Sequence, residues 1–103
     1  EGLAAGAKGA VGSTYNYASN IYIRLIDAFT SGDMPKARQY AFQSASLVQI
    51  LIRYGVVRTG KALMTMRGIE CGPTRAPIKP LTNAERKEIY RLAEPFFATP
   101  VHV

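Results

Sequence analysis

The spacing of the apolar residues constrains this chain more than any other feature of its sequence. From residue 22 onward they recur at steps of three and four, beginning with Tyr22, Leu25, Ile26 and Phe29. This spacing places the side chains on one stripe of an α-helix, and such a stripe packs against other secondary-structure elements. The sequence therefore predicts a mostly α-helical chain.

Two helices are predicted on either side of a glycine–aspartate pair. The first spans residue 16 or 19 to residue 31, and Gly32 ends it because glycine readily adopts the left-handed conformation that follows many helices. Asp33 is a typical capping residue for the second helix, and Pro35 lies in its first turn, where a missing N–H costs little. The second helix is predicted to run to Gly55 and to carry a wide apolar face.

A third helix is predicted after Thr59, which can cap it, and Gly68 ends it. Its apolar positions include a pair of methionines, Met64 and Met66, which we assign to the core. Residues 69–81, IECGPTRAPIKPL, contain three prolines and are predicted to form an irregular crossing.

The last helix is predicted to begin at a Thr-x-x-Glu capping box formed by Thr82 and Glu85. Pro95 and Pro100 bracket its predicted end. Its apolar stripe consists of Ile89, Leu92, Ala93 and Phe96.

Composition bounds the classes of function. The 103 residues fit one small domain, and a hydrophobic content of 48% with 19% charged residues is typical of a globular protein. The net charge of +6 comes from scattered Lys and Arg residues without aromatic interleaving, so neither a nucleic-acid partner nor a membrane partner is predicted. The single cysteine, Cys71, excludes an internal disulfide and fits a reducing, cytoplasmic compartment.

No catalytic residue, metal site or cofactor is predicted from the residues alone. Lys8 and Lys61 are candidate Schiff-base lysines, but nothing nearby in the sequence indicates that either is buried. His102 is the only histidine, and the sequence supplies no partners that would complete a triad or a metal site.

The N-terminal stretch GAKGAVGSTYNY, residues 6–17, combines small residues with a cluster of hydroxyls. It lacks the spacing of a Walker loop or a dinucleotide-binding turn, so we interpret it as a tightly packed buried strand that runs into a loop. Hydroxyls at the end of a strand are where parallel barrels place substrate contacts, and they are equally typical of a helix start. Both interpretations of Ser13 stay open at this point.

Four segments carry a resemblance to a known family: GLAAGAKGAVGSTYNY, SGDMPKARQ, LIRYGVVRTGKALM and CGPTRAPIKPL. Together they resemble the C-terminal third of the N-acetylneuraminate lyases, which share a superfamily with dihydrodipicolinate synthase. The stretch Gly-Ser-Thr-Tyr-Asn is more similar to the lyase branch than to the synthase branch. The resemblance implies a (β/α)₈ barrel with extra C-terminal helices.

Mapped onto this chain, the resemblance implies two parts. Residues 1–32 would be the end of the barrel, in which residues 1–7 finish a helix, residues 8–13 form the eighth strand and residues 16–31 the eighth helix. Residues 33–103 would be the helical extension. A complete barrel takes about 250 residues, so most of it would precede Glu1.

The resemblance also implies a chemistry. The family carries out class I aldol cleavage without a metal, through a Schiff base between a lysine and a keto acid, and N-acetylneuraminate gives N-acetylmannosamine and pyruvate. The Schiff-base lysine and catalytic tyrosine motifs are missing here, so this chain alone is expected to be inactive. Ser13 matches a substrate-contacting serine, and Val57 matches a position near the pocket that often carries a larger residue. The substrate of the full-length parent would be N-acetylneuraminate or a related keto sugar acid, and the family implies a homotetramer.

An interpretation from a different class is a stand-alone helical interaction module, derived from such a barrel and without catalysis. The chain starts with Glu1 rather than Met, within an apolar, glycine-rich run, and this favours a piece of a longer protein.

Overall fold

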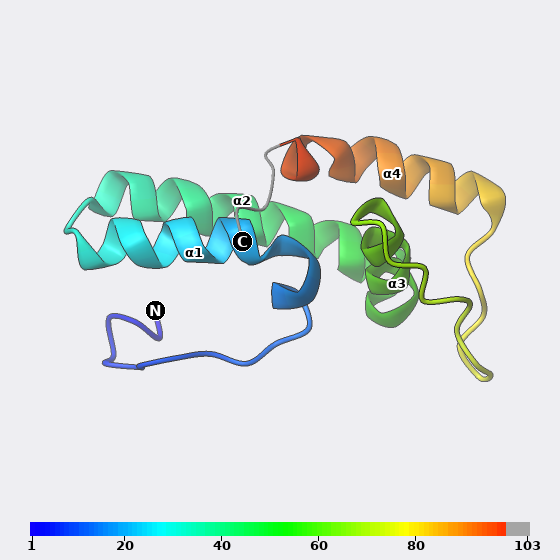
Figure 1. The fold of residues 1–103 in the computed structure, drawn as a ribbon, viewed down its shortest axis with the longest axis horizontal. Helices are drawn as coiled ribbons and strands as arrows, with labels where there is room; N and C mark the ends of the chain where they lie inside the picture. Colours follow the sequence, from blue (N-terminus) through cyan, green and yellow to red (C-terminus); the bar gives the residue numbers. More distant parts are fainter. Residues whose placement is uncertain (99–103) are drawn as a thin grey trace.

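The computed structural model describes residues 1–98, and within them it contains four α-helices and no strand (Figure 1). The helices are α1 (Tyr15–Thr30), α2 (Met34–Tyr54), α3 (Val56–Met66) and α4 (Asn83–Phe97). The prediction of a mostly helical chain is therefore confirmed. Pro100 and His102, considered above, lie outside the described residues.

The strand predicted at residues 8–13 is wrong for this structure. The segment is irregular, and all six of its residues are exposed rather than buried. A strand forms only when its N–H and C=O groups pair with those of a neighbouring strand. Residues 1–98 contain no strand with which residues 8–13 could pair. In Figure 1 the segment runs as a blue trace between the N-terminal turn and the start of α1.

The first seven residues form a turn with the bonding pattern of a helix C terminus. The Ala7 N–H donates to the Gly2 oxygen (2.9 Å) and the Gly6 N–H to the Leu3 oxygen (3.1 Å), while Gly6 has a φ of 93°. This pair of bonds around a left-handed glycine is a Schellman motif. The turn is too short to be assigned as a helix.

Helices α1 and α2 lie side by side as an antiparallel pair (Figure 1). Gly32 turns the chain with a φ of 81°, and the Asp33 carboxylate accepts a hydrogen bond from the Lys36 N–H (3.1 Å). The predicted cap and the predicted stop at Gly55, which follows the last residue of α2, are both confirmed.

The predicted start of α3 at Thr59 is wrong. The helix begins at Val56, directly after Gly55, whose φ of 97° ends α2 and redirects the chain within one residue. Thr59 lies one turn inside the helix with its N–H bonded to the Gly55 oxygen (3.0 Å), and its side chain is fully buried. A single left-handed glycine thus replaces the capping residue that the sequence pattern indicated.

Helix α4 begins as predicted, and its last residue, Phe97, lies between positions 95 and 100, which were predicted to bracket its end. The Thr82 hydroxyl accepts the Glu85 N–H (3.1 Å), while the Glu85 side chain pairs with Arg58 of α3. Pro95 lies inside the last turn and the helix continues to Phe97. Pro95 is on the exposed side, where water can satisfy the carbonyl that its missing N–H leaves free.

The core lies where the four helices meet. It is centred on the fully buried side chains of Leu47 and Leu51 from α2, Leu63 from α3 and Ile89 from α4. Met64 and Met66 pack against this cluster, which fits their assignment to the core. The helices are therefore held together mainly by aliphatic burial.

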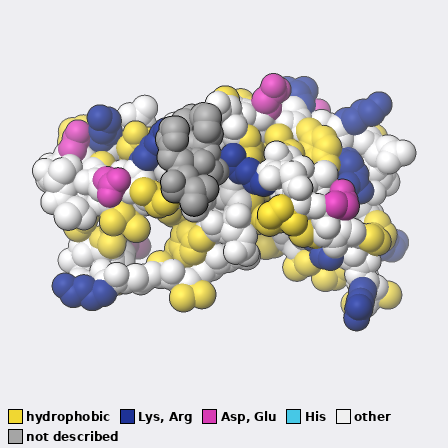
Figure 2. Space-filling model, viewed as in Figure 1, with side chains coloured by type: hydrophobic (Ala, Val, Ile, Leu, Met, Phe, Trp, Pro, Cys, Tyr) yellow, Lys and Arg dark blue, Asp and Glu magenta, His cyan; other side chains and the backbone are white. Residues whose placement is uncertain are grey.

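On the surface, Lys and Arg side chains are separated by hydrophobic and acidic groups on the face drawn in Figure 2. No helix within residues 1–98 is long and apolar enough to cross a membrane.

Candidate functional site

Ser13 lies in the exposed turn that leads into α1. Its main-chain oxygen accepts a hydrogen bond from the Asn16 N–H (3.2 Å). Thr14 is the N-cap residue of α1, and its side chain makes no capping bond. The contact between Ser13 and a substrate stays a prediction.

Tyr17, in the first turn of α1, anchors this region to α3. Its side chain is 4% exposed, and its hydroxyl has no hydrogen-bond partner among residues 1–98. Burial raises the pKa of the Tyr17 phenol above its ordinary value, and the nearby Ser13 hydroxyl opposes this rise without the geometry of a hydrogen bond. A Cβ at Gly60 would lie 3.3 Å from the ring, so glycine lets α3 approach Tyr17 closely.

Arg67 also holds the start of α1, and the sequence analysis missed it. Its Nε donates to the main-chain oxygen of Tyr17 (2.9 Å) and its Nη2 donates to Oδ1 of Asn20 (3.3 Å). The guanidinium lies 4.2 Å from the centre of the Phe97 ring, at the end of α4. Because its partners on α1 are 50 and 47 positions away, no local pattern could have identified this arginine.

Val57 lies in the first turn of α3 and is 52% exposed. It lines an open groove of about 410 Å³ together with Gly55, Val56, Arg58, Ile78 and Lys79. Ser13 does not line this groove. Ser13 and Val57 therefore do not share this groove, and the role of Val57 near a substrate pocket stays a prediction.

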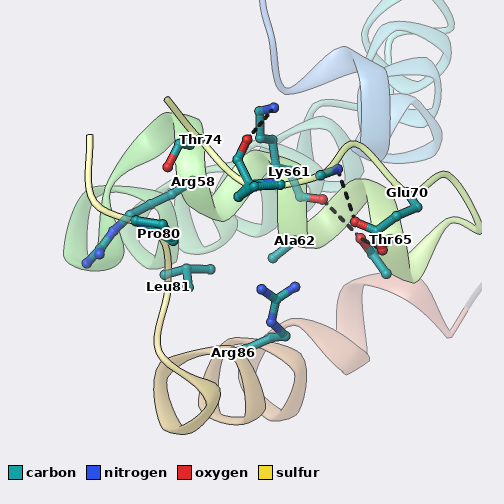
Figure 3. Close-up of a pocket in the computed structure, with 11 residues that line it drawn as sticks. Arg58, Lys61, Ala62, Thr65, Glu70, Thr74, Pro80, Leu81 and Arg86 are labelled. Atoms are coloured by element: carbon teal, nitrogen blue, oxygen red, sulfur yellow. Dashed lines mark hydrogen bonds between the residues drawn. The ribbon is translucent and has the colours of Figure 1, made fainter. Parts of the chain in front are cut away.

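A smaller hollow lies between α3, the crossing at residues 69–81 and α4 (Figure 3). Its volume is about 20 Å³, which is close to the space that a single water molecule needs. The charged residues that line it are Arg58, Lys61, Glu70 and Arg86, and Figure 3 shows the Arg86 side chain pointing from α4 toward Ala62 of α3.

The rim of this hollow ties the crossing to the helices. The Lys61 ammonium donates to the main-chain oxygens of Cys71 (3.1 Å) and Pro73 (3.2 Å). Arg58 pairs with Glu85 at 3.1 Å and donates from Nη1 to the Lys79 oxygen (3.4 Å). Lys61 therefore has a structural role here, and nothing at this position indicates a nucleophile.

A larger hollow is an apolar groove of about 510 Å³ between the N-terminal segment and α1. Residues 1–3 and 7–10 contribute one wall, and Tyr22, Ile23 and Ile26 belong to the other. Ile23 and Ile26 are each about half exposed, at 51% and 45%. This apolar groove, lined by the N-terminal segment and α1, leaves hydrophobic surface uncovered.

No group of three or more His, Cys, Asp or Glu side chains that could hold a metal ion occurs in the part of the chain that the structure describes. Cys71 is exposed and free.

Solved structures provide the first comparison. An N-acetylneuraminate lyase from Aliivibrio salmonicida superimposes with a TM-score of 0.91 at 33% identity, covering 98% of this chain and 34% of that one. The lyase from Proteus mirabilis gives a TM-score of 0.89 at 36% identity, covering 93% of this chain and 32% of that one.

Sequence comparison agrees. The N-acetylneuraminate lyase of Rhizobium meliloti is 32% identical over 97 residues, which are 94% of this chain and 32% of the relative. The chain thus spans about a third of the length of the relatives that it matches. The sequence model of the Dihydrodipicolinate synthetase family matches residues 1–95. The resemblance inferred from the sequence is confirmed, and the chain belongs to the Dihydrodipicolinate synthetase family.

Proposed function

We propose that this chain is the C-terminal third of an N-acetylneuraminate lyase, a class I aldolase that releases N-acetylmannosamine and pyruvate through a Schiff base and without a metal. The observation that carries the proposal is the match to lyases over nearly the whole chain, at 32% and 36% identity to the Rhizobium and Proteus enzymes. The substrate would be N-acetylneuraminate or a related keto sugar acid.

In this proposal, residues 1–32 are the end of the barrel and residues 33–103 are its helical extension. The irregular segment at residues 8–13 would become the eighth strand when neighbouring strands pair with it. The uncovered apolar groove beside it supports this idea, because it offers a surface for the remaining barrel elements.

Two residues are proposed to meet the substrate in the complete enzyme. Ser13 would contact the sugar-derived end, and its exposed position before α1 leaves the hydroxyl accessible. Val57 would lie near the pocket, where its small, half-exposed side chain leaves space that a larger residue would fill. The complete enzyme is proposed to be a cytoplasmic homotetramer, as the family resemblance implies.

The test joins this chain to the N-terminal two-thirds of the Rhizobium meliloti lyase, in place of that enzyme's own C-terminal third. We expect the chimera to release pyruvate from N-acetylneuraminate. A folded chimera without activity would contradict the proposal and favour the interaction module without catalysis.

The chain alone serves as the matched control. It should form no borohydride-reducible adduct with pyruvate, because it lacks the Schiff-base lysine motif and its Lys61 is held by two carbonyl oxygens. Intact mass measures the adduct, and a stable adduct on Lys8 or Lys61 would overturn this expectation.

A further inference from the structure

We propose that Arg67 is a positioning residue that fixes the bend near the start of α1 and thereby the direction in which the Ser13 turn leaves the helix. The bend is local: Ala18 has φ −129° and ψ 25°, which are not helical values. Figure 1 shows the first turn of α1 bent away from the rest of the helix. The proposal that this turn meets a substrate rests on the proposed function.

The contacts of Arg67 bracket the bend. Its Nε donates to the oxygen of Tyr17, directly before the non-helical residue, and its Nη2 donates to Asn20, two residues after it. One planar guanidinium therefore holds both sides of the bend at a fixed spacing, which a point charge such as lysine cannot reproduce.

The backbone at Arg67 is itself held in place. Gly68 has a φ of 85°, and the Ile69 N–H donates to the Met64 oxygen (3.0 Å), which closes α3 with a Schellman motif. The Phe97 ring of α4 packs against the guanidinium at 4.2 Å. Because α3 and α4 hold Arg67 in place, the position of the start of α1 depends on both of these helices.

The first test measures amide hydrogen exchange on the whole chain. Arg67→Gln should reduce protection of the Ala18 amide, which bonds to the Thr14 oxygen, by about tenfold, in the range for losing one hydrogen bond from a charged group. Protection of Leu51 in the core of α2 should change less, and Arg67→Lys should restore part of the loss. Arg91→Gln, at an exposed arginine of α4, is the matched control for the lost charge.

An equal loss of protection at Ala18 and Leu51 would show only global destabilisation and would overturn the proposal, as would no loss at either site.

The second test measures kinetics in the chimera with the Rhizobium lyase segment. Arg67→Gln should raise KM for N-acetylneuraminate by roughly three- to tenfold, the effect of a displaced hydrogen bond, while Schiff-base formation with pyruvate persists. An unchanged KM in a chimera that has lost the Ala18 protection would overturn the link to the substrate. A chimera that retains Arg67 and is inactive would contradict the proposed function itself. The hydrogen-exchange result would then still test whether Arg67 fixes the bend in α1.

Discussion

The Nε of Arg67 donates a hydrogen bond to the main-chain oxygen of Tyr17 across 50 positions of sequence, at 2.9 Å. This bond joins the end of α3 to the first turn of α1, on the same side where Tyr17 packs against Gly60. The turn that carries Ser13 is therefore supported from α3 by two separate contacts.

The buried phenol of Tyr17 should make stability fall at high pH. Its pKa is raised by burial, so above about pH 10 the unfolded chain loses this proton before the folded chain does. The neutral Tyr17 phenol contributes to the free energy of unfolding below its ordinary pKa. This contribution is lost as the pH rises through the pKa that the phenol has in the folded chain. Denaturant unfolding of the wild type and Tyr17→Phe between about pH 8 and pH 11 should show a steeper decline for the wild type. Parallel curves would contradict this.

The two bonds of the Lys61 ammonium should restrain the crossing at residues 69–81. Lys61→Met keeps the length of the side chain but removes the donors to Cys71 and Pro73. We expect trypsin to cleave the Lys61→Met variant after Arg75 faster than it cleaves the wild type. Mass spectrometry of the products measures this rate. Lys87→Met, on the exposed side of α4, is the control and should leave this rate unchanged. Equal rates in all three proteins would argue against the restraint.

Ser13→Ala tests in the chimera whether the Ser13 hydroxyl contacts the substrate. If the hydroxyl contacts the substrate, kcat/KM should fall by a factor that corresponds to about 0.5–1.5 kcal/mol, the net value of one hydrogen bond. If Ser13 only forms part of the turn before α1, the kinetics and the unfolding free energy should both stay nearly unchanged, because Thr14 and not Ser13 is the N-cap residue and Ser13 bonds to Asn16 through its main-chain oxygen. Measuring both on one variant decides between them, and a loss confined to stability would remove Ser13 from the site.

The isolated chain should self-associate through the apolar groove between its N-terminal segment and α1. Ile23 and Ile26 line that groove and are about half exposed. Replacing both by glutamate should shift the sedimentation profile toward monomer, because a charge in a buried contact is costly. Phe42→Glu on α2, where the side chain is 74% exposed and outside the groove, is the control. A compact wild-type monomer would refute the expectation.

The sequence predicted the helices well where local chemistry decides them. Asp33 caps α2 and Thr82 caps α4 through bonds to residues three positions ahead, so spacing alone was sufficient. It failed at Thr59, because a buried threonine inside a helix and a capping threonine look alike in the sequence, and Gly55 was predicted only as the end of α2 and not also as the residue before α3.

Less of the candidate site could be predicted from the sequence. Ser13 and Val57 came from a family resemblance, whereas the contacts that hold the start of α1 come from Arg67 and Gly60, far along the chain. The small residues of the N-terminal stretch predicted a buried strand, and the family resemblance placed it at residues 8–13, but pairing is a property of neighbouring strands and not of the segment itself.

Gly55 is the single residue between α2 and α3. A Cβ there would meet the Arg58 side chain at 3.1 Å, in a backbone conformation that other residues rarely adopt. Removing one residue would rotate α3 by about 100° about its axis and carry Leu63 out of the core. A change in length at this corner would therefore disrupt the core, whereas the irregular crossing between α3 and α4 is the segment of this half of the chain that can best accommodate one.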